Sequence, residues 1–373
     1  MATAGLEGVV AATTRLSKVD GERGELVIGG YPIGELAERA TFEETTWLLW
    51  HGELPREEDL DRFRADLAAR RALPPAVVAL LGECARAGAD SMDALRMASG
   101  ALSLAPSGDE PSSIVARFPT IVAAYSRLMR GQDPVPPRRD LDHAANYLYM
   151  LSGKEPDAER VRGLETYLNT VVDHGLNAST FTARVIVSTG SDLVSAVAGA
   201  VGALKGPLHG GAPGPALDMV FEIGDVSRAE AVLRRKIESG ERLMGFGHRV
   251  YKVRDPRADV LAAAAERMYT RGGDMSLYAL ARGVEAIALR LLEEYKPGRR
   301  LQTNVEFYTA LVLHGLGLDV ALFTPTFAIS RVSGWIAHAL EQKRAGRIIR
   351  PQSEYDGPRN LRWVPLSARR TPA

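Results

Sequence analysis

Three of the seven histidines in this sequence lie among residues that suit chemistry. His174 lies in VVDHGLNASTFTAR, His209 in LKGPLHGGAPG and His248 in MGFGHRVYKVRDPRA. Glycine, asparagine or small hydroxyl residues flank each of them, and such residues allow close backbone approach or cap a helix. A histidine taken alone is more often structural than catalytic, and we keep that interpretation for the other four: His51, His143, His314 and His338.

The segment around His248 concentrates positive charge in a chain whose net charge is zero. Against one acid, Asp255, its four cations are Arg249, Lys252, Arg254 and Arg257. A guanidinium presents a rigid fork of donors that matches a carboxylate or a phosphate. We therefore expect this segment to bind an anionic ligand.

Two further arginines, Arg331 in ISRVSGWIAH and Arg350 in IIRPQSEY, lie in apolar or glycine-rich settings. A lone arginine usually belongs to a solvated surface. Several that converge on one cleft would bind a small di- or tricarboxylate, with each charge-assisted hydrogen bond contributing roughly 1.5–3 kcal/mol. The sequence alone does not show whether these arginines converge.

Metal and nucleotide-loop sites are disfavoured by the motifs. The histidines are far apart, no HxxxH or HExxH pair occurs, and neighbouring arginines repel a cation. GFGHRV contains G-x-G without the third glycine, and no GxxxxGK[ST] motif occurs. A Rossmann domain would also need alternating strands and helices. We expect no metal site.

Composition restricts the class of protein. Hydrophobic residues make up 46% and charged residues 25% of the chain, as in ordinary globular proteins. Zero net charge argues against broad binding to nucleic acid or anionic lipid. A single cysteine, Cys84, excludes an intrachain disulfide and suits a reducing compartment. The N-terminus lacks the pattern of a signal peptide, and we expect no membrane span and a cytoplasmic location.

The periodicity of apolar residues predicts a mostly helical chain. The exception is 8–30, where Val9-Val10 and Leu26-Val27-Ile28 flank the turn-like DGERG and predict a β-hairpin. Ser227 and Glu230 have the spacing of a capping box before a helix. The helix expected at 192–204 is rich in alanine and glycine, which suits either a buried helix or an oligomer interface.

Six motifs resemble those of citrate synthases and follow in the same order, from about residue 5 to residue 355. They are GLEGVVAATTRLSKVDG with FEETTWLLWHGELP, HGLNASTFTARV, LKGPLHGGA, MGFGHRVYKVRDPRA, TNVEFYTALVLHGLG and SRVSGWIAHALEQKRAGRIIRP. The spacing between them is similar to that of the short bacterial and archaeal type of the enzyme.

The resemblance implies a mainly α, two-domain fold with a small N-terminal β-hairpin. The large domain would comprise 1–216 plus 319–373, the small domain 217–318, and the active site the cleft between them. It also implies a homodimer, with the helix at 192–204 near the interface. Oxaloacetate and acetyl-CoA would be condensed and hydrolysed to citrate and CoA. Coenzyme A is then a co-substrate, and no permanently bound cofactor or metal is required.

The resemblance also implies three catalytic residues. His209, in GPLHG, would donate a hydrogen bond to the enolate oxygen of acetyl-CoA, helped by a following helix N-terminus that favours its neutral form. His248 would polarise the carbonyl of oxaloacetate and supply its proton when the new bond forms. Glu306, in NVEF, stands where the family usually has an aspartate and would remove the methyl proton.

Ligand binding is carried over in the same way. His174, Arg257 and Arg331 would hold the carboxylates of oxaloacetate, and Arg350 would reach in from the neighbouring subunit. Lys252 and Arg254 either face the phosphates of CoA or belong to a solvated surface. The backbone of one loop would surround the CoA adenine, and its residues are Arg242, Leu243, Met244, Gly245 and Phe246.

Three departures from the family pattern surround the expected site. Glu306 is one methylene longer than aspartate, Pro213-Gly214 follows GPLHGGA in place of Asn-Glu, and Gly175 replaces the commoner glutamate of HELN. They leave two alternatives beside citrate synthesis. One is a 2-methylcitrate synthase that uses propionyl-CoA. The other is a catalytically weak paralogue that binds a ligand or partner, although the catalytic histidines and substrate arginines argue against it.

Overall fold

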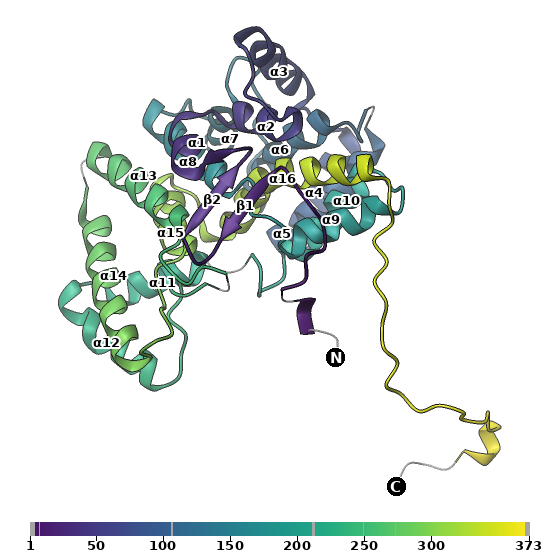
Figure 1. The fold of residues 1–373 in the computed structure, drawn as a ribbon. Helices are drawn as coiled ribbons and strands as arrows, with labels where there is room; N and C mark the ends of the chain where they lie inside the picture. The colour runs from purple at the N-terminus through teal and green to yellow at the C-terminus, as the bar shows by residue number, and fades with distance from the viewer. Residues whose placement is uncertain are drawn as a thin grey trace. The chain divides into compact units, whose positions relative to one another are not determined.

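The computed structural model describes residues 4–6, 8–105, 107–210, 213–248, 250–272 and 274–369. The predicted mainly α fold is confirmed (Figure 1). The helices are α1 Ile33–Arg39, α2 Phe42–His51, α3 Glu57–Arg70, α4 Pro75–Arg86, α5 Ser91–Ala101, α6 Pro111–Met129, α7 His143–Ser152, α8 Ala158–Val171, α9 Ala178–Ser188, α10 Leu193–Leu204, α11 Pro213–Ile223, α12 Val226–Glu238, α13 Pro256–Gly272, α14 Ser276–Tyr295, α15 Val305–Gly315 and α16 Phe323–Ala345. Short 3₁₀ helices are η1 Ala4–Leu6, η2 Leu102–Leu104, η3 Val320–Leu322 and η4 Leu366–Ala368.

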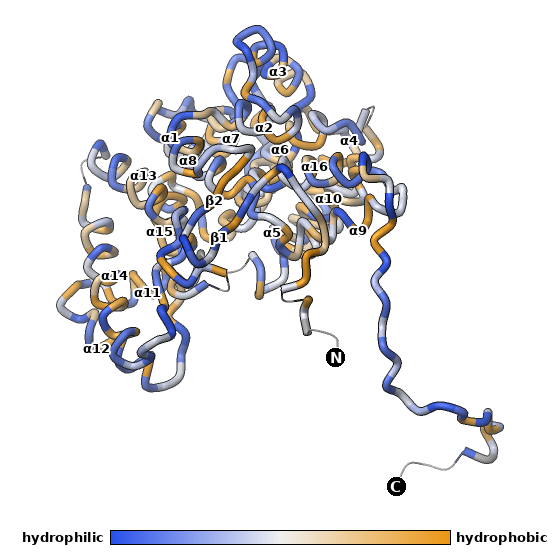
Figure 2. The backbone as a smooth tube through the Cα atoms, viewed as in Figure 1, coloured by the Kyte–Doolittle hydropathy of each residue, from blue (hydrophilic) through white to orange (hydrophobic). Residues whose placement is uncertain are grey.

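A small antiparallel sheet precedes the helices. Its strands are β1 Ser17–Asp20, β2 Glu25–Ile28 and β3 Tyr31–Pro32, in the order β1-β2-β3. The turn lies at the predicted DGERG, but the first strand begins at Ser17 and not at Val9-Val10. Both of those valines are exposed, whereas Ile28 and Leu26 of β2 are buried. Figure 2 shows hydrophobic residues along β2, whereas α3 is largely hydrophilic.

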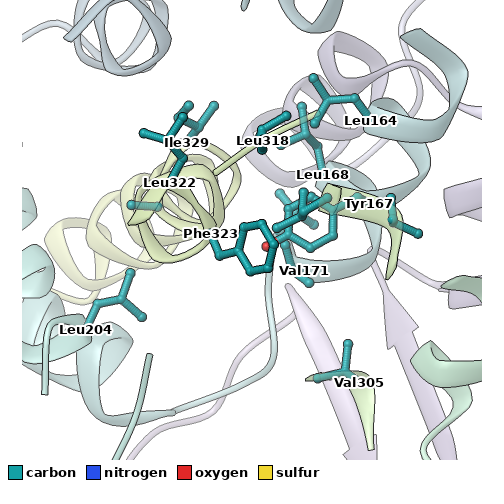
Figure 3. Packing of buried hydrophobic residues seen from close by; sticks show 14 of the residues in the cluster. Leu164, Tyr167, Leu168, Val171, Leu204, Val305, Leu318, Leu322, Phe323 and Ile329 are labelled. Atoms are coloured by element: carbon teal, nitrogen blue, oxygen red, sulfur yellow. The ribbon is translucent and has the colours of Figure 1, made fainter. Parts of the chain in front are cut away.

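Helix α16 runs through the core. It packs against α6, α8, α9 and α10, and Trp335 and Ile336 are fully buried. In Figure 3, Tyr167 and Val171 of α8 lie beside Phe323 at the start of α16.

The stretch Val320–Ala345 is the one described helix long and apolar enough to cross a membrane by length and composition. However, 78% of its apolar window is buried inside the protein, as in the core helix of a globular fold.

Helices α11 to α15 form a group of neighbours that carries the segment around His248 (Figure 1). Within this group, Gly247 N–H donates to the carbonyl oxygen of Gln302 at 2.7 Å, and Phe246 forms an isolated β-bridge with Thr303. Gly245 has φ +88, and a Cβ there would come within 2.9 Å of the Phe307 ring. The glycines of GFG therefore let this loop lie against the start of α15.

The chain divides into two compact units, which are 14–348 and the described residues of 1–13 with 349–369. Every predicted site residue except Arg350 belongs to 14–348. The finer division into a large domain, 1–216 plus 319–373, and a small domain, 217–318, stays a prediction.

Candidate active site

His174, His248 and Arg257 lie in one cluster around Tyr251. His174 Nε2 is 3.1 Å from the Tyr251 hydroxyl, and the rings of His174 and His248 meet edge-on at 5.8 Å. Arg257 Nη2 is 3.5 Å from His248 Nε2, and its guanidinium lies over the Tyr251 ring. Tyr251 is only 2% exposed. The structure thus brings together two substrate-binding candidates and one catalytic candidate.

The hydrogen bonds of His248 determine which ring nitrogen carries its proton. The backbone N–H groups of Val250 and Tyr251 donate to Nδ1 at 3.0 and 3.1 Å. A nitrogen that accepts hydrogen bonds is unprotonated, and the two backbone bonds to Nδ1 are shorter than the 3.5 Å approach of Arg257 to Nε2. The proton of the neutral ring therefore lies on Nε2, and Arg257 and Nε2 approach each other as two donors without a hydrogen bond between them. Burial, followed by the charge of Arg257, lowers the pKa of His248 to about 4. At neutral pH, His248 is therefore a neutral donor through Nε2.

His209 is also neutral, but with the opposite tautomer. The hydroxyl of Ser179 lies 2.8 Å from Nε2, and the Ser179 backbone N–H points at the same nitrogen at 3.4 Å. The Ser179 oxygen accepts from Trp335 Nε1 at 3.0 Å. Its single proton has two acceptors within 2.8 Å, Asn177 Oδ1 and His209 Nε2. The backbone N–H of Ser179 can only donate, so Nε2 of His209 is an acceptor. The His209 proton then lies on Nδ1. Burial, and secondarily Arg331, lowers the pKa of His209 to about 4.

The neutrality of His209 therefore has a local cause besides the helix predicted to follow it. Helix α11 begins at Pro213, and residues 211 and 212 before it lie outside the described residues. Arg249, one of the four cations near His248, also lies outside the described residues.

Arg257 is positioned by Asp255 at the start of α13. Its Nε and Nη2 donate to the two oxygens of Asp255 at 3.0 and 2.8 Å, and its backbone N–H donates to the same carboxylate. Burial opposes the charge of the guanidinium, but Asp255 outweighs it and raises the pKa of Arg257. Arg257 is therefore a fixed cation, held through one edge of its fork.

Arg331 is a second buried cation close to Arg257. It is 1% exposed on α16, its Nε donates to the carbonyl of Val171 at 2.7 Å, and its guanidinium lies 4.5 Å from the Phe327 ring centre. Burial lowers its pKa to about 10, and Arg257 adds to the shift by repulsion. Two buried cations that repel each other would be stabilised by an anion between them.

Glu306 lies in the first turn of α15, where the N-cap Asn304 accepts its backbone N–H at 3.0 Å. Burial raises the pKa of its carboxyl to about 7, while Arg257 and Arg331 act in the opposite direction. A carboxyl group with a pKa near neutrality is suited to act as a general base. The charges of Arg257 and Arg331 both favour the ionised form of Glu306, which links its protonation to the two buried cations.

The predicted CoA-binding residues occupy the loop between α12 and α13. Arg242 and Lys252 have exposed side chains, whereas Leu243 and Phe246 are buried at 6% and 8% exposure. The role of this loop in binding the CoA adenine stays a prediction.

Arg254 and Arg350 lie in different surroundings. Arg254 forms ion pairs with Glu285 at 2.6 Å and with Asp259, and this pairing favours a structural role over phosphate binding. Arg350 belongs to the terminal unit, and its side chain is exposed.

Sequence reasoning missed the residues that orient the predicted ones: Ser179, Tyr251 and Asp255. Tyr251 and Asp255 lie within the cationic segment, and Ser179 follows the N-cap Asn177 of α9. Their types carry no signal of their own, because serine, tyrosine and aspartate are common in loops and helix starts. Their roles follow only from the distances.

Cavity volume does not locate this site. Two cavities, of about 440 and about 250 Å³, are lined by other residues. Among the described residues, no group of three or more histidine, cysteine or acidic side chains is arranged to hold a metal ion. The convergence of perturbed titratable groups identifies the candidate site.

Comparisons with known proteins identify the family of the chain. Residues 5–352 match the family described as "Citrate synthase, C-terminal domain". Citrate synthase 2 of Bacillus subtilis is 42% identical over 378 residues, covering 99% of both chains. The 2-methylcitrate synthase of Mycobacterium tuberculosis is 39% identical, covering 95% of this chain and 90% of that one.

A solved structure has the same fold. It is a ternary complex of citrate synthase from Thermoplasma acidophilum with carboxymethyl coenzyme A and oxaloacetate. It is 30% identical, with a TM-score of 0.90, and covers 99% of this chain and all of that chain. The resemblance inferred from the motifs is thereby confirmed, and the chain belongs to the citrate synthase family of acyltransferases.

Proposed function

We propose that this protein condenses oxaloacetate with acetyl-CoA and hydrolyses the thioester to citrate and CoA. One observation carries the proposal. Two neutral histidines with opposite tautomers lie in one electrostatically coupled cluster with a carboxyl group whose pKa is about 7. This set supplies a base and two hydrogen-bond donors, which a Claisen-type condensation needs.

The first step is removal of a proton from the methyl group of acetyl-CoA. A methyl group next to a thioester is a very weak acid, so the developing enolate oxygen must be stabilised. Glu306 takes the proton, and His209 donates a hydrogen bond from Nδ1 to that oxygen. Because Ser179 holds Nε2 as an acceptor, the His209 proton is directed away from Ser179.

The second step forms the carbon–carbon bond. The methyl carbon attacks the ketone carbon of oxaloacetate, and His248 donates from Nε2 to the ketone oxygen and supplies its proton. Water then cleaves the thioester and releases CoA. The products balance: acetyl-CoA, oxaloacetate and water give citrate and CoA.

Oxaloacetate is a dianion, and the two buried guanidiniums of Arg257 and Arg331 supply matching charge. His174, which burial and then both arginines hold neutral by lowering its pKa, would donate a hydrogen bond. Arg350 would come from the second subunit of a homodimer, and the loop 242–246 with Lys252 would hold CoA. The large and small domains, 1–216 plus 319–373 and 217–318, would face each other across the site.

The ligands of the Thermoplasma acidophilum complex, carboxymethyl coenzyme A and oxaloacetate, support this choice of substrates. CoA then enters and leaves as a co-substrate, without a permanently bound cofactor, in a cytoplasmic enzyme.

Thiol release from the purified protein tests the function. With oxaloacetate and acetyl-CoA, free thiol should appear at a rate that depends on both substrates. Propionyl-CoA is the second arm, because a 2-methylcitrate synthase is 39% identical over most of the chain. Faster release from propionyl-CoA would make 2-methylcitrate the product. Ligand binding without release from either thioester would identify the weak paralogue.

A further inference from the structure

The turn of the β1–β2 hairpin lies directly against the segment that carries His248. The backbone N–H of Lys252 donates to the carbonyl of Gly21 at 2.9 Å. A Cβ on Gly21 would lie 2.1 Å from the carbonyl oxygen of Val250, whose own N–H donates to His248. At the other side of the turn, a Cβ on Gly24 would meet the Val253 side chain at 2.8 Å. The turn and the segment 250–253 are therefore in backbone contact.

The opposite end of β1 contacts the segment that carries His174. The Ser17 hydroxyl donates to Asp173 and accepts the N–H of Gly175 at 3.0 Å, so it bonds the residue on each side of His174. Gly175 has φ +60, a conformation that glycine adopts without strain. Ser17 thus fixes the backbone from which the His174 ring projects.

Asp173 is itself anchored in the core. It accepts from His338 Nε2 at 3.1 Å, and His338 Nδ1 lies 3.0 Å from Arg184. Arg184 also pairs with Glu341 at 2.6 Å. Because the guanidinium donates to Nδ1, His338 carries its proton on Nε2 and donates it to Asp173. Ser17 is therefore bonded to a buried network that resists displacement.

The hairpin between these two contacts is short, and its second strand is anchored in the hydrophobic core. Strand β1 pairs with β2 from Ser17↔Ile28 to Asp20↔Glu25, and Ile28 and Leu26 are buried in the core. Gly21 lies four positions after Ser17, a span of roughly 13 Å at the rise of an extended strand. A paired strand of this length transmits position from one end to the other.

We propose that the β1–β2 hairpin sets the separation between His174 and the His248–Arg257 segment, with Ser17 and Gly21 as positioning residues for oxaloacetate. The inference rests on the proposed function, in which both segments bind the same small substrate. The His174–Tyr251 contact at 3.1 Å spans the gap that the hairpin maintains. Misplacement of a reacting group by about 1 Å costs on the order of 100-fold in rate.

Gly21→Ala tests the contact at the turn. The added Cβ would start 2.1 Å from the Val250 oxygen and needs about 3.4 Å for ordinary contact, so the two segments must separate by about 1 Å. We expect kcat/KM for oxaloacetate to fall by about 10- to 100-fold per folded molecule, together with a lower Tm because the clash is with backbone atoms. Gly34→Ala on α1 is the matched control, because a Cβ there meets nothing within 4 Å. It should keep wild-type kinetics.

Ser17→Ala and Ser17→Thr test the other end. Loss of the hydroxyl should raise the KM for oxaloacetate and leave the KM for the acyl-CoA unchanged, because His174 binds only oxaloacetate. Threonine restores the hydroxyl and should recover the wild-type KM. A purely structural role would lower the Tm without separating the two KM values.

Two results would overturn the proposal. One is unchanged oxaloacetate kinetics in Gly21→Ala or Ser17→Ala. The other is an activity loss that disappears when rates are expressed per folded molecule. If the unmodified protein releases no thiol, the proposed function fails instead. Calorimetry of oxaloacetate binding to Gly21→Ala and Gly34→Ala then decides the role of the hairpin, and equal affinities would contradict it.

Discussion

Replacing Glu306 with glutamine should stabilise the protein, and the gain should grow as the pH rises. Glu306 has a pKa of about 7 in the folded protein against an ordinary value of 4.5. Below pH 4.5 the carboxyl is protonated in both states and costs nothing. Between pH 4.5 and 7 the unfolded chain loses this proton while the folded protein keeps it, so stability falls as the pH rises.

The size of the effect follows from this difference. A difference of one unit between the folded and unfolded pKa corresponds to about 1.4 kcal/mol. The Glu306 carboxyl therefore lowers the free energy of unfolding by about 1 kcal/mol at pH 5 and by about 3 kcal/mol at pH 8. Glutamine has a similar size and no charge, so Glu306→Gln removes this cost. Urea unfolding of both proteins at the two pH values measures it. A difference that does not change with pH, or a less stable variant at pH 8, would refute the elevated pKa.

Four further variants address the assigned roles. His209→Ala should abolish condensation while oxaloacetate still binds, and more than a tenth of the wild-type turnover would exclude His209 as the enolate donor. Arg257→Ala and Arg331→Ala should each weaken oxaloacetate binding by roughly 2–5 kcal/mol, because a buried carboxylate loses a partner. Unchanged affinity in calorimetry would remove that residue from the site. Arg350→Ala should also weaken oxaloacetate binding. In mixed dimers of Arg350→Ala with a variant that is inactive at another site residue, one of the two active sites should regain activity. Recovery of both sites, or of neither, would contradict an active site shared between subunits.

Much of the fold could be predicted because its signals are local. The helix at 192–204 was predicted within a residue of α10, and the DGERG turn was placed correctly. The first strand was misplaced, because Val9 and Val10 have strand-like side chains but are exposed, and the strand that pairs with β2 begins at Ser17. The capping box of Ser227 and Glu230 was wrong, because Asp225 caps α12 and Glu230 pairs with Arg234. Asp225 and Ser227 are both common N-cap residues, so residue type alone does not tell which of them caps the helix.

The sequence shows that Gly175 and Gly214 depart from the family pattern, but it does not show why glycine is needed at these positions. Gly175 has a positive φ, and a Cβ on Gly214 would lie 2.7 Å from Val320, so backbone conformation and close packing favour glycine at these positions. Such reasons depend on three-dimensional neighbours. The tautomers of His209 and His248 likewise depend on donors from Ser179 and from the backbone, and no spacing rule contains that information.

The central claim is that Glu306 is the general base, and thiol release by Glu306→Gln tests this claim most directly. With oxaloacetate and acetyl-CoA both saturating, the variant should bind both substrates, yet release thiol at least about 100-fold more slowly, since a general base contributes about 10²–10⁴. Glu306→Asp measured beside it should also be slower than wild type, because the shorter side chain stops short of the methyl group. Near-native thiol release by the glutamine variant would contradict the account, because the methyl proton would then be taken by another group.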